Sequence, residues 1–148
     1  MADLLECLIQ IKGLADTPRR LALRTAEAVS MSHRPEEAAR HARGVARRLL
    51  SAEREFHGSL VRMLSDDGPA LPALDAVGAV GAALGAPGEC ERAFAAERAE
   101  TVRLLEACSA DQLNRVGIEP SRGPMTVADL VAVMLAHDTD RLGELVTR

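Results

Sequence analysis

The residues that could do chemistry in this sequence are concentrated near its C-terminus. In the segment 126–147, Asp138 falls in the middle of an apolar stripe at helical spacing. His137 and Arg141 lie together at one margin of that stripe, one turn apart. A carboxylate in an apolar stripe is costly unless it is paired or hydrogen-bonded. Asp138 is therefore the most informative single residue of the chain.

A second set of polar residues borders the apolar stripe of the segment 35–64. These residues are Arg48, His41 and Ser59. If this segment and the segment 126–147 form neighbouring helices, Arg48 meets the three polar residues of the last helix in one pocket, with His41 at its edge. Ligand sites between the helices of a bundle are built in this way.

Helical spacing dominates the rest of the chain, and strand signals are nearly absent. Four long helices are expected, over 3–29, 35–64, 88–108 and 126–147. Pro18 should kink or split the first of them. Residues 65–90 form a crossover rich in Gly, Pro and Ala, with a weak helix over 75–84, and residues 117–124 form a loop. The predicted fold is all-α: one domain over 1–148, a four-helix bundle with one long crossover connection.

Several helix starts have recognisable signals. Pro35 is followed by Glu36 and Glu37, which favours a helix beginning there. Ser109 begins one short extra turn, and Thr126 with Asp129 forms a variant of the capping box. These signals fix the ends of the segments that position the polar residues.

Composition excludes several classes of protein. The chain has 148 residues, 47% of them hydrophobic, and a net charge of -4 with two Phe, no Trp and no Tyr. It is too apolar for an intrinsically disordered protein, and it lacks the charge and aromatic rings that nucleic-acid binding requires. No apolar run is long enough to span a membrane, and the acidic N-terminus does not fit a signal peptide. We therefore expect a cytoplasmic protein with no nucleic-acid or membrane partner.

The cysteines and arginines each have an ordinary explanation. Three separated Cys residues, with no C-x-x-C pair, fit a reducing compartment and are not expected to be catalytic. The chain has 17 Arg and one Lys, which is typical of GC-rich coding, as in actinobacteria. Four arginines on the outer face of the second helix predict a solvated surface paired with carboxylates: Arg40, Arg43, Arg47 and Arg54.

Five stretches together resemble the DinB-like superfamily over about 35–148. They are 47–56, 61–69, 94–98 with Leu104-Leu105, the loop 114–123, and 125–130 followed by His137-Asp138. The last two match a loop pattern R-x-G-x-H-P-x-x-G and a helix ending in H-D-x-x-H. This superfamily includes mycothiol- and bacillithiol-dependent transferases and a mycothiol-dependent maleylpyruvate isomerase. The resemblance implies a helical bundle and favours a homodimer, for which the apolar first helix offers a surface.

The departures from this pattern concern the metal site. Members that hold a metal use one His in the second helix and two His at i, i+4 in the last. His137 matches the first of that pair, but Arg141 and Arg48 occupy the other two positions, and Glu119 replaces the loop His. Arginine has no lone pair to offer a metal. We therefore predict no bound metal and no cofactor.

The first hypothesis is a metal-independent small-molecule enzyme of the isomerase, transferase or biosynthetic tailoring type. Arg48 and Arg141 would bind an anionic or polar substrate, His137 would transfer a proton, and Asp138 would hold an Arg or His in place. The residues expected to contact the substrate are His41, Glu119 and Ser59.

The alternative is a non-catalytic ligand-binding or interaction protein whose polar cluster is structural. In that case Asp138 pairs with Arg48 or Arg141 and fixes the helix register. An open cavity beside His137 favours an enzyme, whereas interdigitated side chains favour the structural role. A thiol transferase is the weaker third option, because the ligands of the thiol-activating metal are missing.

Overall fold

The structure is a computed structural model that describes residues 3–79, 81 and 85–146. Four long helices run along one bundle: α1 (Leu4–Met31), α2 (Pro35–Ser65), α3 (Glu89–Glu106) and α5 (Val127–Val146). α1 and α2 each pack against both α3 and α5. The predicted all-α four-helix bundle is confirmed, and α1 continues through Pro18 without being split.

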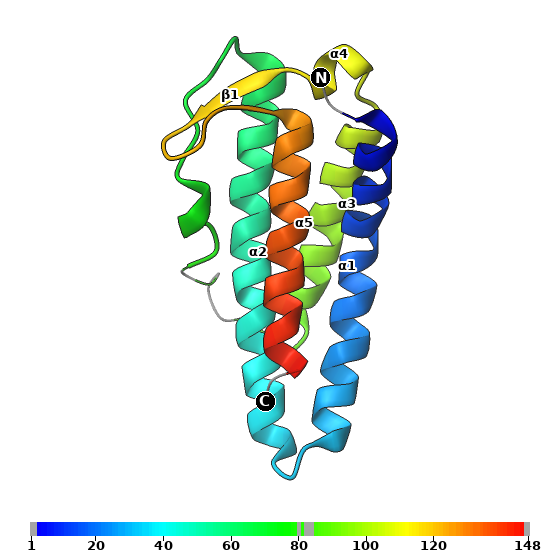
Figure 1. The fold of residues 1–148 in the computed structure, drawn as a ribbon. Coiled ribbons are helices and arrows are strands. Elements are labelled where there is room, and N and C mark those ends of the chain that lie inside the picture. The colour runs from blue at the N-terminus through cyan, green and yellow to red at the C-terminus, as the bar shows by residue number, and fades with distance from the viewer. Residues whose placement is uncertain (1–2, 80, 82–84, 147–148) are drawn as a thin grey trace.

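The long crossover lies between α2 and α3. These two helices run in the same direction, so the chain returns along the bundle between them (Figure 1). The crossover contains one 3-10 turn, η1 (Leu74–Ala76), in place of the expected helix over 75–84. Positions 80 and 82–84 lie outside the described residues.

The expected loop 117–124 is instead part of a β-hairpin, and that expectation was wrong. β1 (Val116–Glu119) pairs antiparallel with β2 (Gly123–Thr126), after the short helix α4 (Ala110–Leu113). The Leu71 N–H donates to the Ile118 carbonyl and the Ile118 N–H to the Pro69 carbonyl, each at 2.8 Å. The crossover therefore supplies hydrogen bonds to β1 that local sequence cannot reveal.

The predicted helix starts are confirmed. The Thr126 N–H donates to Asp129 at 2.9 Å, and the Asp129 N–H donates to the Thr126 hydroxyl at 3.0 Å. Ser109 and Gln112 form a full capping box at α4. Pro35 is the first residue of α2.

The apolar core consists of two clusters along the bundle axis. The first includes Leu14, Phe56 and Met134, and the second includes Leu21, Phe94 and Leu142. In α1, α3 and α5, the buried polar residues Thr17, Arg98 and Asp138 lie in the sequence between members of the two clusters. These positions form the polar layer described below.

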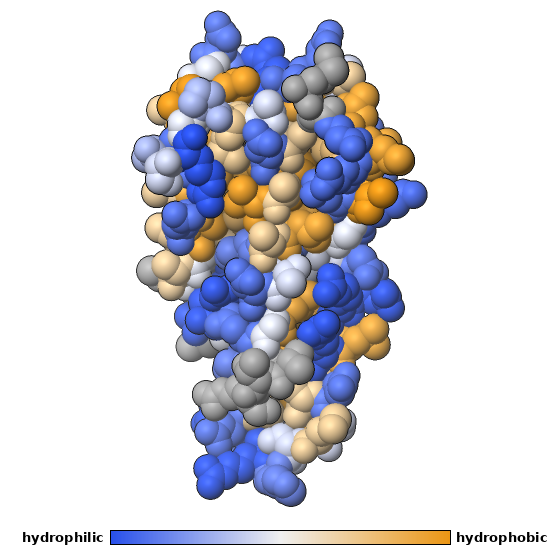
Figure 2. All heavy atoms as spheres, in the orientation of Figure 1, coloured by the Kyte–Doolittle hydropathy of each residue, from blue (hydrophilic) through white to orange (hydrophobic). Residues whose placement is uncertain are grey.

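Apolar side chains also lie on the outside of α1. Leu5, Leu8 and Ile9 are at least half exposed, and Figure 2 shows an orange patch over the N-terminal half of α1. Homodimerisation through this helix stays a prediction. Within the described ranges, no helix combines the length and apolarity needed to cross a membrane.

Candidate functional site

A buried polar layer joins all four long helices. It consists of Thr17 on α1, Glu53 on α2, Arg98 on α3 and Asp138 on α5, each at most 1% exposed. Arg98 donates to both oxygens of Asp138, with Nη1–Oδ2 at 2.6 Å and Nη2–Oδ1 at 2.9 Å. The Thr17 hydroxyl also donates to Asp138 Oδ2, at 2.6 Å. The carboxylate that periodicity places in an apolar stripe is thus fully paired.

Arg98 has two further partners. Its Nε donates to Glu53 at 2.9 Å, and its Nη1 donates to the Leu14 carbonyl at 2.9 Å. Leu14 precedes Pro18 by four residues, so the proline has no N–H to offer this carbonyl. The guanidinium replaces the missing helical hydrogen bond. This is how α1 tolerates a proline in its interior.

The sequence analysis was wrong about the partner of Asp138. Its partner is Arg98, whereas Arg48 and Arg141 pair elsewhere. Burial raises the pKa of Glu53, although the neighbouring Arg98 opposes that shift. With two carboxylates around one guanidinium, this layer is a structural element of the core.

Arg48 and Arg141 do meet, as the neighbouring-helix argument predicts. Both bind Glu144, with Arg48 Nη2–Oε1 at 3.1 Å and Arg141 Nη1–Oε2 at 3.2 Å. Each arginine side chain is about one-third exposed (31% and 30%). Glu144 was missed in the sequence because it follows Arg141 by three residues and looks like an ordinary surface ion-pair partner.

His137 lies on the same side of α5 as Arg141. Its ring meets the Phe56 ring edge-on, with centroids 5.5 Å apart. Its Nδ1 is buried and has no hydrogen-bond partner among the described residues. Burial lowers the pKa of His137, and the nearby Arg141 lowers it further, whereas Asp138 raises it. The net shift favours the neutral imidazole.

The crossover covers His137 with a glycine. Gly78 has a φ of +70°, and a Cβ atom there would lie 2.9 Å from the Arg48 carbonyl oxygen and 3.3 Å from His137 Nε2. Its N–H donates to Glu55 at 2.9 Å. Only glycine fits this close approach. Gly78 is thus a missed residue of the site, and only the fold could reveal it.

A cavity of about 260 Å³ opens beside His137. It is lined by side chains of α2, η1, α5 and the hairpin: Phe56, Leu74, Asp75, Arg122, Val133, Ala136, His137, Asp140 and Arg141. Arg122 donates to Asp75 at 2.9 Å and to Glu119 at 2.6 Å. The hairpin is therefore tied to η1 across this cavity.

Glu119 reaches the cavity only through Arg122. Its carboxylate accepts from the Ser121 N–H at 2.6 Å and is fully buried within the hairpin. The Ser121 N–H, with further hydrogen bonds from Arg122 and the Ser121 hydroxyl, lowers the pKa of Glu119 to about 2. The residue is an anionic anchor for Arg122.

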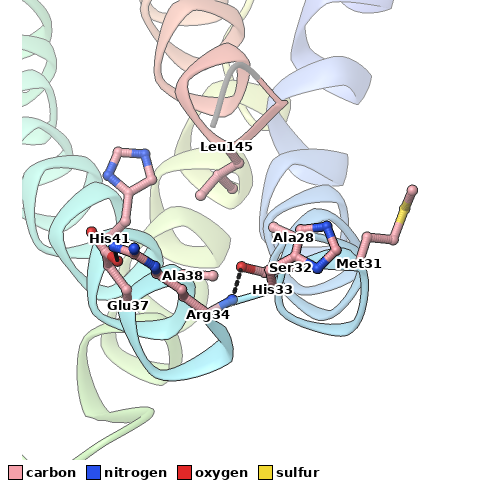
Figure 3. A pocket seen from close by; sticks show the side chains of 9 residues that line it. All are labelled: Ala28, Met31, Ser32, His33, Arg34, Glu37, Ala38, His41 and Leu145. Carbon is pink, nitrogen blue, oxygen red and sulfur yellow. Dashed lines mark hydrogen bonds and ion pairs between the residues drawn. The ribbon is translucent and has the colours of Figure 1, made fainter.

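His41 and Ser59 are not among the residues that line this cavity. His41 binds the Glu144 carbonyl oxygen at 2.9 Å and lines a different pocket of about 330 Å³, at the turn between α1 and α2 (Figure 3). Ser59 is buried, and its hydroxyl has no partner within the described part of the chain. Of the predicted site residues, the cavity is therefore lined by His137 and Arg141. Glu144 links Arg48 and His41 to Arg141, whereas Asp138 and Ser59 are buried away from the cavity.

The residues at the family's three metal positions do not fit a metal ion. His137 alone can ligate, because the guanidiniums of Arg48 and Arg141 have no lone pair to offer. Within the described residues, no group of three His, Cys, Asp or Glu is arranged to hold a metal. Burial raises the pKa of the Cys7 and Cys108 thiols, which disfavours a thiolate at either position.

Comparison with known proteins identifies the family. The chain belongs to the DinB superfamily, whose family model matches residues 14–145. YfiT from Bacillus subtilis, described as a probable metal-dependent hydrolase with an unusual four-helix bundle topology, superimposes with a TM-score of 0.80. The two chains are 13% identical, and the match covers 99% of this chain and 87% of YfiT. This likeness concerns the fold. No curated protein matches the chain.

Proposed function

We propose that this protein binds a small anionic or polar molecule in the cavity beside His137 and acts on it without a metal. The observation that carries the proposal is the cavity itself. Its lining includes the imidazole of His137, whose neutral form is favoured, and the guanidiniums of Arg122 and Arg141. The sequence analysis named an open cavity beside His137 as the feature that favours an enzyme over a structural cluster. A cavity lies at that position, which supports the proposal.

The charges on the cavity suit a ligand with both an anionic group and a hydrogen-bond donor. Arg141 and Arg122 can bind a carboxylate or phosphate through paired N–H groups. Asp140 and Asp75 lie on the same cavity and can accept from a ligand hydroxyl or amine. Arg48 does not line the cavity, and its effect on a ligand would be indirect, because Glu144 binds both Arg48 and Arg141.

The chemistry that fits these groups is a proton transfer. A neutral His137 accepts a proton from a carbon next to a carbonyl, and Arg141 stabilises the oxyanion of the enolate that forms. Return of the same proton to a different carbon completes an isomerisation, with no other reactant. Asp138 contributes indirectly, because its pairing with Arg98 fixes α5.

A ligand screen by thermal unfolding tests the proposal. The probes are maleate, succinate and phosphate, with succinamide as the uncharged match for succinate. A probe present at 100 times its Kd should stabilise the wild type by about 2.7 kcal/mol. This corresponds to a rise in Tm of very roughly 5–10 °C for a domain of this size. Arg141→Ala should abolish the response, and the exposed Arg62→Ala should keep it.

Failure of every anionic probe at millimolar concentration to shift the wild type would overturn the proposal. An equal response to succinamide and succinate would also overturn the role given to the guanidiniums. Both results can be read without knowing the natural substrate.

The alternative is a purely structural cluster, and one observation favours it. Glu144 already binds both Arg48 and Arg141, so these guanidiniums have an internal counter-ion. On this hypothesis Arg141→Ala lowers the Tm of the unliganded protein, and no probe raises the Tm of the wild type. The same screen therefore separates the two functions.

A further inference from the structure

Arg122, in the turn between β1 and β2, binds two carboxylates at the cavity beside His137. Its Nη1 donates to Glu119 Oε2 at 2.6 Å, and its Nη2 donates to Asp75 Oδ1 at 2.9 Å. Arg122 and Asp75 both line the cavity, whereas Glu119 does not. The guanidinium therefore has one partner within the hairpin and one on the cavity lining.

Glu119 is the fixed partner. Its side chain is 0% exposed, and its carboxylate also accepts from the Ser121 N–H at 2.6 Å and the Ser121 hydroxyl at 2.8 Å. The Ser121 N–H and the other donors keep the pKa of Glu119 at about 2, so the carboxylate is charged at neutral pH. A buried carboxylate that lost the guanidinium would lack its counter-ion. Nη1 therefore stays on Glu119 when a ligand enters the cavity.

Asp75 is the exchangeable partner. Its side chain is 74% exposed, and within the described residues its carboxylate accepts from Arg122 alone. The Arg122 side chain is itself 38% exposed. Water and salt screen an ion pair this exposed, so it contributes little to stability and can be broken at small cost. An anion that enters the cavity can therefore take the place of Asp75 on Nη2.

A ligand carboxylate offers this guanidinium the same chemistry as Asp75. Guanidinium groups bind carboxylates through N–H groups in one plane. Glu119 fixes that plane before a ligand arrives, so little conformational freedom is lost when the ligand carboxylate binds. Arg141, the other guanidinium on the cavity, binds Glu144, which does not line it. Of the two, Arg122 is the one whose internal partner occupies the cavity lining.

We propose that Arg122 binds the carboxylate of the ligand, and that Asp75 occupies its Nη2 group until the ligand displaces it. This role of Arg122 rests on the function proposed for the His137 cavity and adds to it the residue that selects the ligand. An uncharged ligand cannot replace Asp75 on the guanidinium, so the exchange favours anionic ligands over neutral ones of the same shape. Once displaced, Asp75 is free to accept from a hydroxyl or amine of the same ligand.

Titration with succinate, followed by calorimetry, tests the exchange in the wild type and in Asp75→Asn. Succinate has no hydroxyl or amine for Asp75 to bind, so removal of this carboxylate acts only on the competition for Arg122 and on the charge of the cavity. We expect Asp75→Asn to bind succinate about two- to fivefold more tightly, the fold-change that corresponds to an exposed ion pair. Succinamide, the uncharged match, should bind both proteins equally. Arg122→Gln should weaken succinate binding at least about tenfold.

Asp140→Asn is the matched control. Asp140 lines the same cavity but forms no ion pair within the described residues, so its removal measures the effect of cavity charge alone. We expect at most about half the gain seen for Asp75→Asn, because screened charges interact weakly. The Nε–H signal of Arg122 in NMR spectra, assigned by its loss in Arg122→Gln, gives an independent readout. Succinate should shift this signal in the wild type. Circular dichroism verifies that each variant is folded.

Three results would overturn the role of Arg122 and Asp75 while the proposed function stands. In each of them succinate binds the wild type. The first is equal succinate affinity in the wild type and Asp75→Asn, and the second is the same gain from Asp140→Asn. The third is succinate binding that leaves the Arg122 signal unmoved.

An absence of binding separates this inference from the function on which it rests. If succinate binds none of these proteins but phosphate binds the wild type, the carboxylate-binding role of Arg122 is wrong. If maleate and phosphate also fail to bind, the proposed function is wrong as well.

Discussion

Removal of the Arg98 side chain tests the buried polar layer directly. Arg98→Met keeps a chain of similar length but removes the cation that binds Asp138, Glu53 and the Leu14 carbonyl. Both carboxylates are buried, so the variant leaves them without a counter-ion. Removal of one partner from a buried ion pair costs about 3–5 kcal/mol. Since domains are stable by about 5–15 kcal/mol, this is a large part of the total.

The loss of unfolding free energy can be measured by urea unfolding, and the fall in Tm by thermal unfolding, each followed by circular dichroism at 222 nm. At about 2–4 °C per kcal/mol, the expected fall in Tm is very roughly 6–20 °C. Replacement of the whole layer, with Asp138→Leu and Glu53→Leu added to Arg98→Met, should restore much of the stability, because no unpaired charge is then left. A cost below about 1 kcal/mol for Arg98→Met alone would refute the assignment of a structural ion network.

Pro18 provides an independent test of the same contact. In Pro18→Ala, the new N–H can donate to the Leu14 carbonyl, which Arg98 otherwise serves. The substitution should therefore stabilise the Arg98→Met background more than the wild type, by about 1–3 kcal/mol, the cost of an unsatisfied buried acceptor. Equal effects in the two backgrounds would show that the carbonyl does not depend on Arg98.

Four further predictions concern the site and its supports. Glu119→Gln should lower the free energy of unfolding above pH 4.5. Because the folded carboxyl holds its charge down to a pH of about 2, the difference in unfolding free energy between variant and wild type should vanish as the pH falls towards that value. A difference that stays constant with pH would contradict this. Gly78→Ala should lower the free energy of unfolding by at least about 1–2 kcal/mol more than Gly68→Ala. Both glycines have a positive φ, but only at Gly78 would an added Cβ lie close to other atoms, such as the Arg48 carbonyl oxygen. Equal losses for the two variants would refute the close packing. His137→Asn should reduce the loss of stability as the pH falls below about 6.5, since the lowered pKa makes the unfolded chain bind the proton first; an unchanged slope would argue against a buried neutral imidazole. Elemental analysis of tag-free protein should find well under one equivalent of zinc, iron or nickel, and a stoichiometric metal would sink the metal-independent proposal.

Helical periodicity was enough to predict the four long helices and to mark Asp138 as unusual. It could not identify Arg98, because that residue lies on a helix with many charged neighbours and shows its role only when α3 faces Asp138. The same limit explains the wrong partner for Asp138. Helical spacing placed Arg48 and Arg141 beside the pocket expected around Asp138, and both were therefore considered as its partner. In the structure, their side chains instead bind Glu144.

The hairpin and Gly78 show a second limit of the sequence. β1 and β2 contain four residues each, and β1 also bonds to Pro69 and Leu71, some fifty residues away. The close approach of Gly78 to Arg48 and His137 likewise depends on where the crossover lies. Short strands and loop contacts of this kind are decided by tertiary structure and not by local propensity.

The buried layer and the cavity are physically linked through two consecutive residues of α5. Neighbouring side chains on a helix point about 100° apart, so the direction of Asp138 sets the direction of His137. The two hydrogen bonds from Arg98 and the one from Thr17 hold Asp138 in a single orientation. His137 must then face Phe56 and the cavity. A structural role for Asp138 therefore supports a functional role for His137. Arg98→Lys, which keeps the charge but loses the planar fork, should change the His137 pKa measured by NMR even where the helix content is unchanged.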